Sequence, residues 1–212
     1  MNQELVKRIL SSIILIPISF FFIIKGSLPF IIFMSVCFFI TILEWHIMTK
    51  DKPYKIYGYI FLVISFYTIY EIRNDESLGY WIFIFITIIC ISTDIGGYVF
   101  GKLFKGPKLT KFSPNKTFSG MVGGYILSVI SLIIFTNYTF EKDLPNNWIL
   151  FVLIISSISQ LGDIIVSYFK RLSKVKDTGK IIPGHGGLLD RIDGMIFAFP
   201  IFYLIELTGQ LP

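Results

Sequence analysis

The residues best suited to chemistry lie near the carboxyl end of the chain, in the stretch KVKDTGKIIPGHGGLLDRIDG from Lys174 to Gly194. This stretch combines acids, bases, a histidine and glycines in a chain that is otherwise mostly apolar. Asp190 and Asp193 are three residues apart, which places both on one face of a helix start. Two carboxylates so close repel each other unless a metal ion or a cation such as Arg191 lies between them.

A third acid, Asp163, interrupts an apolar run earlier in the chain, and Ser167 follows one turn later on the same helical face. An acid within a membrane segment is a functional candidate by default. Together with Asp190 and Asp193 it supplies the oxygen ligands that suit Mg²⁺, which commonly binds one or two carboxylates plus substrate phosphates. Asp94, at the expected end of another apolar run, is a further candidate ligand.

The glycines of this stretch suit a phosphate-binding loop. Pro183 and Gly184 fit the central positions of a type II turn, and Gly186 and Gly187 follow closely. Glycines let the backbone approach a ligand and direct successive amide groups at phosphate oxygens. The alternative is a turn that binds nothing. The first interpretation predicts a phosphate and metal site beside a membrane.

The whole composition indicates a membrane protein. Of the 212 residues, 54% are hydrophobic and only 16% charged, and the mean hydropathy is +0.72. We therefore expect an all-α, polytopic transmembrane helix bundle of about seven spans. A signal peptide is not expected, because no small-residue cleavage site follows the first apolar run. The apolar stretches are residues 9–24, 28–43, 56–70, 80–91, 121–136, 148–169 and 192–207.

The charges indicate a topology. Seven spans place sixteen of the nineteen Lys and Arg residues on one side, and only Lys25, Arg73 and Lys142 on the other. Since basic loops remain in the cytoplasm, we expect a cytoplasmic amino terminus and two long cytoplasmic loops. The insertion rule and attraction to anionic lipids would explain the charge alone. They do not explain the acids, histidine and glycines within the same loops.

The first of the two long loops, expected within residues 92–124, contains the turn SPNKT with Lys116. Gly97 and Gly101 have the spacing that lets membrane helices approach closely, and so do Gly120 and Gly124. These spacings are also compatible with a homodimer. We divide the chain into amino-terminal transmembrane helices, residues 1–90, and a catalytic transmembrane region with both basic loops, residues 91–212.

The run SYFKRLSKVKDTGKIIPGHGGLLDRID, which begins at Ser167, is similar throughout to the signature of the phosphatidate cytidylyltransferases, also called CDP-diacylglycerol synthases. The segments DIGGY, GK, SPNKT and QLGD resemble other conserved parts of that family. The resemblance implies a multi-pass enzyme of the inner (plasma) membrane whose active site faces the cytoplasm. It would transfer CMP from CTP to phosphatidic acid, giving CDP-diacylglycerol and pyrophosphate, with Mg²⁺ and also K⁺. Its partners would be these substrates and membrane lipids, and not nucleic acid.

The resemblance and the residue types together give a candidate site. Asp163 and Asp190 look like paired metal ligands, with Asp193 and Asp94 as further ligands. The catalytic candidates are Asp163, Asp190, Lys176 and His185, and the substrate-binding candidates are Lys116, Ser167, Lys170, Arg171, Asp177, Gly186, Gly187 and Arg191. His185 is expected either to stabilise pyrophosphate or to donate to a loop carbonyl. One departure from the family is Ser119, where many members carry an acid.

Two other functions are compatible with parts of this pattern. A transporter or channel would use Asp163 and Asp94 as an ion path, but such proteins usually show internal repeats and polar groups near the midplane, whereas this sequence shows no repeat and its acids are expected at one membrane face. A lipid kinase would use the same loops and cleave the nucleotide at a different phosphate, so product analysis separates it from a cytidylyltransferase. We interpret Cys37 and Cys90 as buried apolar residues, and His46 as interfacial packing.

Overall fold

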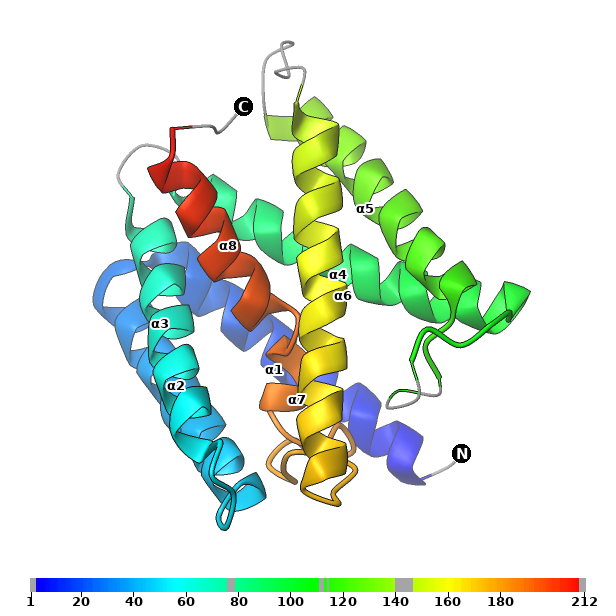
Figure 1. Ribbon diagram of the computed structural model, residues 1–212. Coiled ribbons are helices and arrows are strands. Elements are labelled where there is room, and N and C mark those ends of the chain that lie inside the picture. Colours follow the sequence, from blue (N-terminus) through cyan, green and yellow to red (C-terminus); the bar gives the residue numbers. More distant parts are fainter. Residues whose placement is uncertain (1–2, 76–78, 111–112, 114, 140–146, 210–212) are drawn as a thin grey trace.

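The computed structural model describes residues 3–75, 79–110, 113, 115–139 and 147–209, and within these ranges the regular structure is helical. Lys111 lies outside the described residues. Figure 1 shows the arrangement of the helices. Their bounds are α1 Gln3–Lys25, α2 Ser27–Met48, α3 Lys55–Asn74, α4 Gly79–Phe104, α5 Phe118–Thr139, α6 Trp148–Leu172, α7 Leu189–Ile192 and α8 Met195–Leu207.

Six of the described helices, α1 to α6, are long and apolar enough to cross a membrane, and α8 is a shorter apolar helix. The all-helical prediction is therefore confirmed, and the expected count of about seven agrees with six spans plus α8. With 13 residues, α8 is only about 20 Å long, less than the thickness of a hydrocarbon core. The short α7 and the loop before it lie below α8 (Figure 1).

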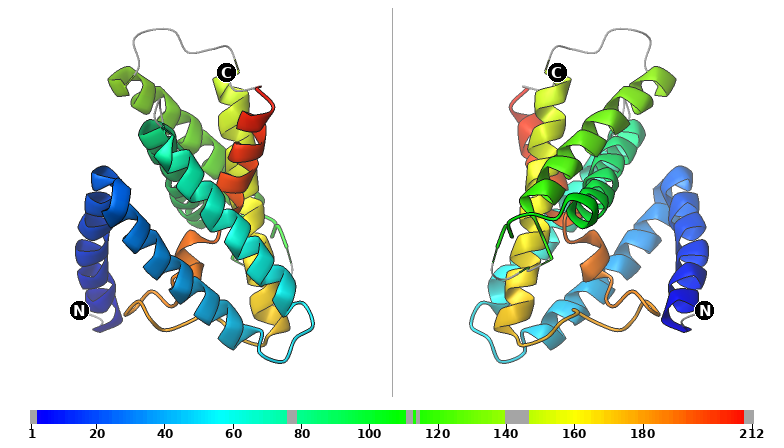
Figure 2. Two further views of the ribbon diagram at one scale, coloured as in Figure 1. Left: turned by 90° about the vertical axis from the view of Figure 1, so that its left-hand side faces the viewer. Right: turned by 90° about the vertical axis from the view of Figure 1, so that its right-hand side faces the viewer.

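The core lies where α8 packs against α3 and α6, with α4 beside them. Its fully buried side chains include Ile86 and Ile89 of α4, Ile155 of α6 and Phe199 of α8. By contrast, α1 packs mainly on α2 and stands to one side of the bundle, as Figure 2 shows. Most described apolar side chains of α1 are exposed, which suits a helix that faces lipid.

Glycines allow α4 and α5 to cross in close contact. A Cβ atom on Gly96 would lie 2.2 Å from the carbonyl oxygen of Gly123, and one on Gly120 would lie 2.6 Å from that of Gly97. The predicted close approach of small residues is therefore confirmed, but it occurs within one chain. These glycines give no support to the expected homodimer, because the partner helix belongs to the same molecule.

The fourth helix is longer than the sequence indicated. The expected span ended near Ile91, followed by a loop, whereas α4 continues to Phe104. Hydrogen bonds between Ser92 and Ser131 and from Thr93 to Ser156 attach this polar part of α4 to α5 and α6. Asp94 accordingly lies within α4 and not at the start of a loop. The helix also runs continuously through the expected division of the chain at residue 90.

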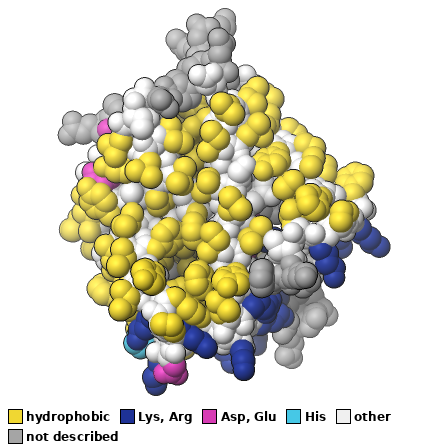
Figure 3. All heavy atoms as spheres, in the orientation of Figure 1, with side chains coloured by type: hydrophobic (Ala, Val, Ile, Leu, Met, Phe, Trp, Pro, Cys, Tyr) yellow, Lys and Arg dark blue, Asp and Glu magenta, His cyan; other side chains and the backbone are white. Residues whose placement is uncertain are grey.

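Basic side chains gather at one end of the molecule. Figure 3 shows Lys and Arg side chains along its lower edge, below a broad surface of hydrophobic side chains. The α2–α3 connection and the α6–α7 connection both lie at this end, and so does the start of α1 (Figure 1). The charge separation along the sequence therefore corresponds to a separation in space.

Candidate active site

The segment from Ser173 to Leu188 joins α6 to α7, and we call it the signature loop. His185 N donates to Ile182 O at 3.0 Å, and Gly184 has φ +77°. This is the predicted type II turn with Pro183 and Gly184 at its centre. Ile182 N also donates to Gly186 O at 3.0 Å, where φ is +88°. Glycine at 184 and 186 thus permits a left-handed backbone that other residues rarely adopt.

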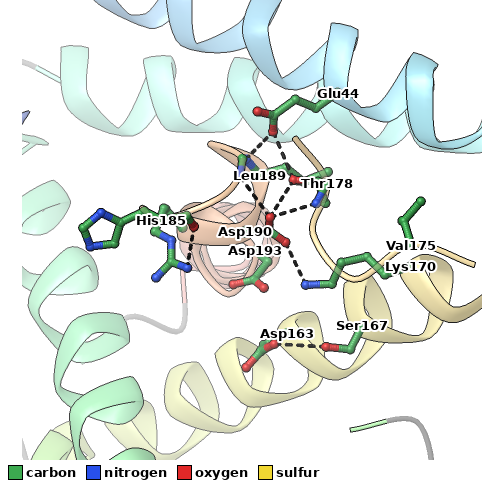
Figure 4. Close-up of polar contacts among 12 residues, drawn as sticks. Glu44, Asp163, Ser167, Lys170, Val175, Thr178, His185, Leu189, Asp190 and Asp193 are labelled. Atoms are coloured by element: carbon green, nitrogen blue, oxygen red, sulfur yellow. Dashed lines mark hydrogen bonds and ion pairs between the residues drawn. The ribbon is translucent and has the colours of Figure 1, made fainter. Parts of the chain in front are cut away.

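Asp190 organises this loop. Its Oδ1 accepts a 2.7 Å hydrogen bond from Lys170 Nζ. Its Oδ2 accepts bonds from Thr178 N at 2.8 Å, Thr178 Oγ1 at 3.0 Å and Gly187 N at 3.1 Å. Burial alone would raise the pKa of Asp190, but these donors outweigh it and hold the pKa below its ordinary value. Both oxygens of Asp190 are thus satisfied by protein groups, as Figure 4 shows.

Three groups that were predicted to bind phosphate, Lys170, Gly186 and Gly187, take part in this arrangement around Asp190. The ammonium of Lys170 is buried against Asp190. The amide of Gly187 donates to the same carboxylate, and Gly186 holds the turn. The structure therefore brings Lys170, Gly186 and Gly187 to the predicted loop, where the observed partners of Lys170 and Gly187 are protein atoms.

Asp193 differs from Asp190 in its environment. It is 7% exposed, and the described contact of its Oδ1 is with the neighbouring Gly194 N at 3.0 Å. Burial raises the pKa of Asp193 well above its ordinary value, and the negative charges of Asp163 and Asp94 raise it further. The positive charges of Lys170 and Lys116 offset this only in part, so a further cation beside these acids would be favourable.

Asp163 and Ser167 lie on one face of α6, as predicted. Ser167 Oγ donates to Asp163 Oδ1 at 3.4 Å, and Asp163 Oδ2 forms an ion pair with Lys116. Lys116 belongs to the α4–α5 loop, residues 105–117, so this ion pair brings the first basic loop to the acid on α6. The side chains remain partly accessible, 21% for Lys116 and 30% for Asp163.

Several predicted substrate contacts are exposed around this cluster. Lys176, Asp177, Arg171 and Arg191 all have exposed side chains. Arg171 donates to Val175 O at 3.3 Å and Arg191 to His185 O at 2.8 Å. The structure thus places these four residues on or beside the signature loop, where their charges are open to solvent.

His185 points away from the acids and toward α1 (Figure 4). Its Nδ1 lies 2.8 Å from Ser11 Oγ, and Arg8 Nε donates to Gly184 O at 2.8 Å. Burial lowers the pKa of His185, and the charges of Arg191 and Arg8 lower it further. A hydrogen bond to the backbone of Pro183 opposes this lowering of the pKa and agrees with the expected donation to a loop carbonyl, whereas the contact with Ser11 of α1 was not expected.

Glu44 of α2 was missed by the sequence analysis. It is 2% exposed, and its carboxylate contacts the signature loop and α7. The available signal was an acid at the end of an apolar run, the same signal that selected Asp94. The amino-terminal helices resemble the family only in being hydrophobic, so no motif marks Glu44 in the sequence.

The start of α5 explains Ser119. Thr117 Oγ1 accepts from Gly120 N at 3.1 Å, so Thr117 caps the helix. Ser119 Oγ donates to Lys105 O and thereby fastens the beginning of the α4–α5 loop. At this position the hydroxyl holds a loop, and no described contact joins it to the acids.

The residues present fit a divalent cation in part. Among the described residues, no group of three or more His, Cys, Asp or Glu side chains is arranged to enclose a metal ion. Asp163 and Asp193 nevertheless offer two hard oxygen ligands, which is the number that Mg²⁺ commonly takes from a protein when phosphates complete its shell. The geometry favours Asp193 as the partner of Asp163, since both oxygens of Asp190 are already bonded.

The chain is similar to known enzymes over most of its length. The sequence profile of the Cytidylyltransferase family matches residues 56–208. A phosphatidate cytidylyltransferase of Rickettsia felis is 34% identical over 214 residues, covering 97% of this chain and 94% of the relative. The enzymes of the same name from Brucella suis and Staphylococcus saprophyticus are 33% and 38% identical, covering 85% and 73% of this chain. The chain spans 66% of the length of the Brucella suis relative and 59% of the Staphylococcus saprophyticus relative. With these matches, the chain belongs to the Cytidylyltransferase family.

Proposed function

We propose that this chain is a phosphatidate cytidylyltransferase, which transfers CMP from CTP to phosphatidic acid and produces CDP-diacylglycerol and pyrophosphate. The observation that carries the proposal is its similarity to the Rickettsia felis enzyme over 97% of the chain. The clustering of Asp163, Asp190 and Asp193 with the signature loop supports it independently. A site between a basic surface and apolar helices suits one soluble and one lipid substrate.

The chemistry requires two anions to meet. An oxygen of the phosphatidate headgroup attacks the α-phosphorus of CTP, and the bond to pyrophosphate breaks. The side chains therefore have to neutralise charge and align the two phosphates, more than to remove a proton. Exposed Lys176, Arg171 and Arg191 are suited to binding phosphate oxygens as they arrive. Lys116 can serve in the same way when it exchanges Asp163 for a substrate phosphate.

We assign Mg²⁺ binding to Asp163 and Asp193, with Asp94 near them and with K⁺ as an accompanying ion. Mg²⁺ would withdraw negative charge from the triphosphate when bound. Asp190 then serves the site indirectly. Its bonds to Lys170, Thr178 and Gly187 keep the loop in place next to the ligands.

We further propose that the basic end of the bundle faces the cytoplasm and that the protein is located in the bacterial inner membrane. The gathering of Lys and Arg at one end supports this orientation through the positive-inside rule. CTP would arrive from the cytoplasm, whereas phosphatidic acid would enter sideways from the bilayer. A homodimer remains an expectation from the sequence, and binding of nucleic acid is not expected.

The decisive experiment follows two labels of CTP. The purified protein in detergent micelles receives phosphatidic acid, Mg²⁺ and CTP labelled at either the α-phosphate or the γ-phosphate. A cytidylyltransferase transfers the α label to the lipid and releases the γ label as pyrophosphate. Transfer of the γ label to the lipid would instead identify a lipid kinase, and absence of any labelled lipid would contradict the proposal.

A further inference from the structure

Glu44 is a buried acid with no role in the chemistry described so far. Among the described residues, Glu44 and Asp193 are buried acids, at 2% and 7% exposure of the whole residue, and the side chain of Asp190 is 5% exposed. A buried carboxylate is costly unless hydrogen bonds compensate for lost water. The described partners of Glu44 all come from the other end of the chain, and Figure 4 shows its carboxylate directed at them.

Glu44 uses both of its carboxylate oxygens. Oε1 accepts from Leu188 N at 2.9 Å, and Oε2 accepts from Leu189 N at 2.8 Å. Thr178 Oγ1 lies 3.2 Å from Oε2. These residues follow Glu44 by 134 to 145 positions in the sequence. Helix α2 thus holds the middle and the end of the signature loop and the first residue of α7 in place.

Two glycines of the signature loop make room for this carboxylate. A Cβ atom on Gly179 would lie 2.6 Å from Glu44 Oε1, and one on Gly187 would lie 2.6 Å from Glu44 Oε2. Either distance is too short for a non-bonded contact. The glycines at these positions therefore permit the approach of a protein carboxylate, where the sequence suggested a phosphate.

Thr178 joins Glu44 to Asp190. Its hydroxyl lies 3.2 Å from Glu44 Oε2 and 3.0 Å from Asp190 Oδ2, and it has a single proton to donate. The opposite oxygen of Asp190 is paired with Lys170 of α6. A continuous set of contacts therefore runs from α2 through Thr178 and Asp190 to α6.

We propose that Glu44 is a positioning residue of the active site. By holding Thr178, Leu188 and Leu189 from α2, it keeps the carboxylates of Asp190 on α7 and of Asp193 in position relative to Asp163 on α6. This inference rests on the proposed cytidylyltransferase function. It also assigns part of the catalytic scaffold to the amino-terminal helices.

The test compares Glu44→Gln with Thr41→Val, both purified in detergent. Gln retains one acceptor but places an amide group toward a backbone donor, so at least one bond is lost. Thr41 is a suitable control, because it is buried on α2 one turn earlier and its described bond is to Cys37 O of its own helix. We expect kcat to fall at least about tenfold in Glu44→Gln, because a hydrogen bond to a charged group is lost from the support of the site. KM for CTP should change less than about threefold, because Glu44 does not contact the substrate. Thr41→Val should retain the activity of the unmodified chain.

A second measurement separates positioning from general destabilisation. Lys180 in the signature loop and Lys50 in the α2–α3 connection are both exposed. Glu44→Gln should increase tryptic cleavage at Lys180 and leave cleavage at Lys50 unchanged. Thr178→Val should reproduce part of both effects, and the double variant should lose less than the two single losses combined. If Glu44→Gln does not accumulate, Thr178→Val serves as the test. A lower kcat and faster cleavage at Lys180 in Thr178→Val would support the positioning role, and unchanged values of both would refute it.

Inactivity of the unmodified chain toward CTP and phosphatidic acid would refute the proposed function, whereas protection of Lys180 would still report on Glu44. Full activity of the unmodified chain with unchanged kcat and cleavage in Glu44→Gln would refute the positioning role alone.

Discussion

Lys116 of the α4–α5 loop forms an ion pair with Asp163 of α6, and this pair joins the first basic loop to an acid on a helix that the sequence keeps apart from it. Neither side chain is fully buried. A partly exposed ion pair contributes only about 1 kcal/mol or less to stability. Lys116 can therefore leave Asp163 when a phosphate or a metal ion offers a better partner.

Replacement of Asp163 or Asp193 by Asn should abolish most activity. Each variant removes a negatively charged oxygen from the pair assigned to Mg²⁺, so we expect kcat to fall at least about a hundredfold. Steady-state assays over a range of Mg²⁺ concentrations check this. Asp51→Asn, at an exposed position of the α2–α3 connection, is the control and should retain normal kinetics. Near-normal turnover of either site variant would remove that residue from the metal site.

Lys176→Gln should weaken substrate binding without affecting stability. Lys176 is exposed on the signature loop, and a compact ammonium there suits a phosphate. We expect KM for one of the two substrates to rise at least about threefold, with an unchanged thermal midpoint. Lys116→Gln should have a smaller effect, since Lys116 already has Asp163 as a partner. A larger rise in KM for Lys116→Gln than for Lys176→Gln would contradict this ranking. Normal kinetics in both variants would mean that the two lysines contribute only to the orientation of the protein in the membrane.

His185→Gln should retain most activity, with less than about a threefold loss, because His185 contacts α1 and not the acids. Burial and the charges of Arg191 and Arg8 lower its pKa, which favours the neutral ring. Its stabilising contribution is complete above the ordinary pKa and is lost as pH falls through the lower folded-state pKa. Thermal midpoints of both proteins between about pH 5 and 8 should therefore converge at the acidic end. A loss of a hundredfold in His185→Gln would instead indicate a catalytic imidazole.

Single cysteines should report the orientation of the bundle. In a background without Cys37 and Cys90, cysteines at Lys108 and Lys180 should resist an impermeant thiol reagent added to spheroplasts. A cysteine at Asn74, exposed at the other end of α3, should react. Labelling in the reverse pattern would place the basic end outside the cytoplasm.

The sequence predicted those features that depend on residue type and local spacing alone. Apolar runs revealed the helices, and the Pro183–Gly184 pair revealed a turn whose bond from His185 N to Ile182 O is present. The sequence also indicated Asp163, Asp190 and Asp193 as candidate ligands, but it paired Asp163 with Asp190, and the preference for Asp193 depends on bonds to Asp190 that the fold supplies.

The partners of individual side chains were not predictable. Helical periodicity relates Lys170 to residues one turn away on α6, such as Val166. Its ion-pair partner, Asp190, instead follows it by 20 positions and reaches it only because the signature loop folds back. Glu44 and His185 likewise contact residues more than 100 positions away. Such contacts depend on how α1, α2 and α7 pack, and helical periodicity carries no information about that packing.

The contact between Glu44 and Leu189 spans 145 positions, and this has a consequence for biosynthesis. At about 5 to 20 residues per second, a ribosome needs on the order of ten seconds to proceed from one to the other. During that interval α2 has already been synthesised, whereas Leu188 and Leu189, whose amides will donate to the Glu44 carboxylate, have not. Since an uncompensated carboxylate is costly in hydrocarbon, nascent α2 must keep Glu44 hydrated at the membrane surface until translation is nearly complete.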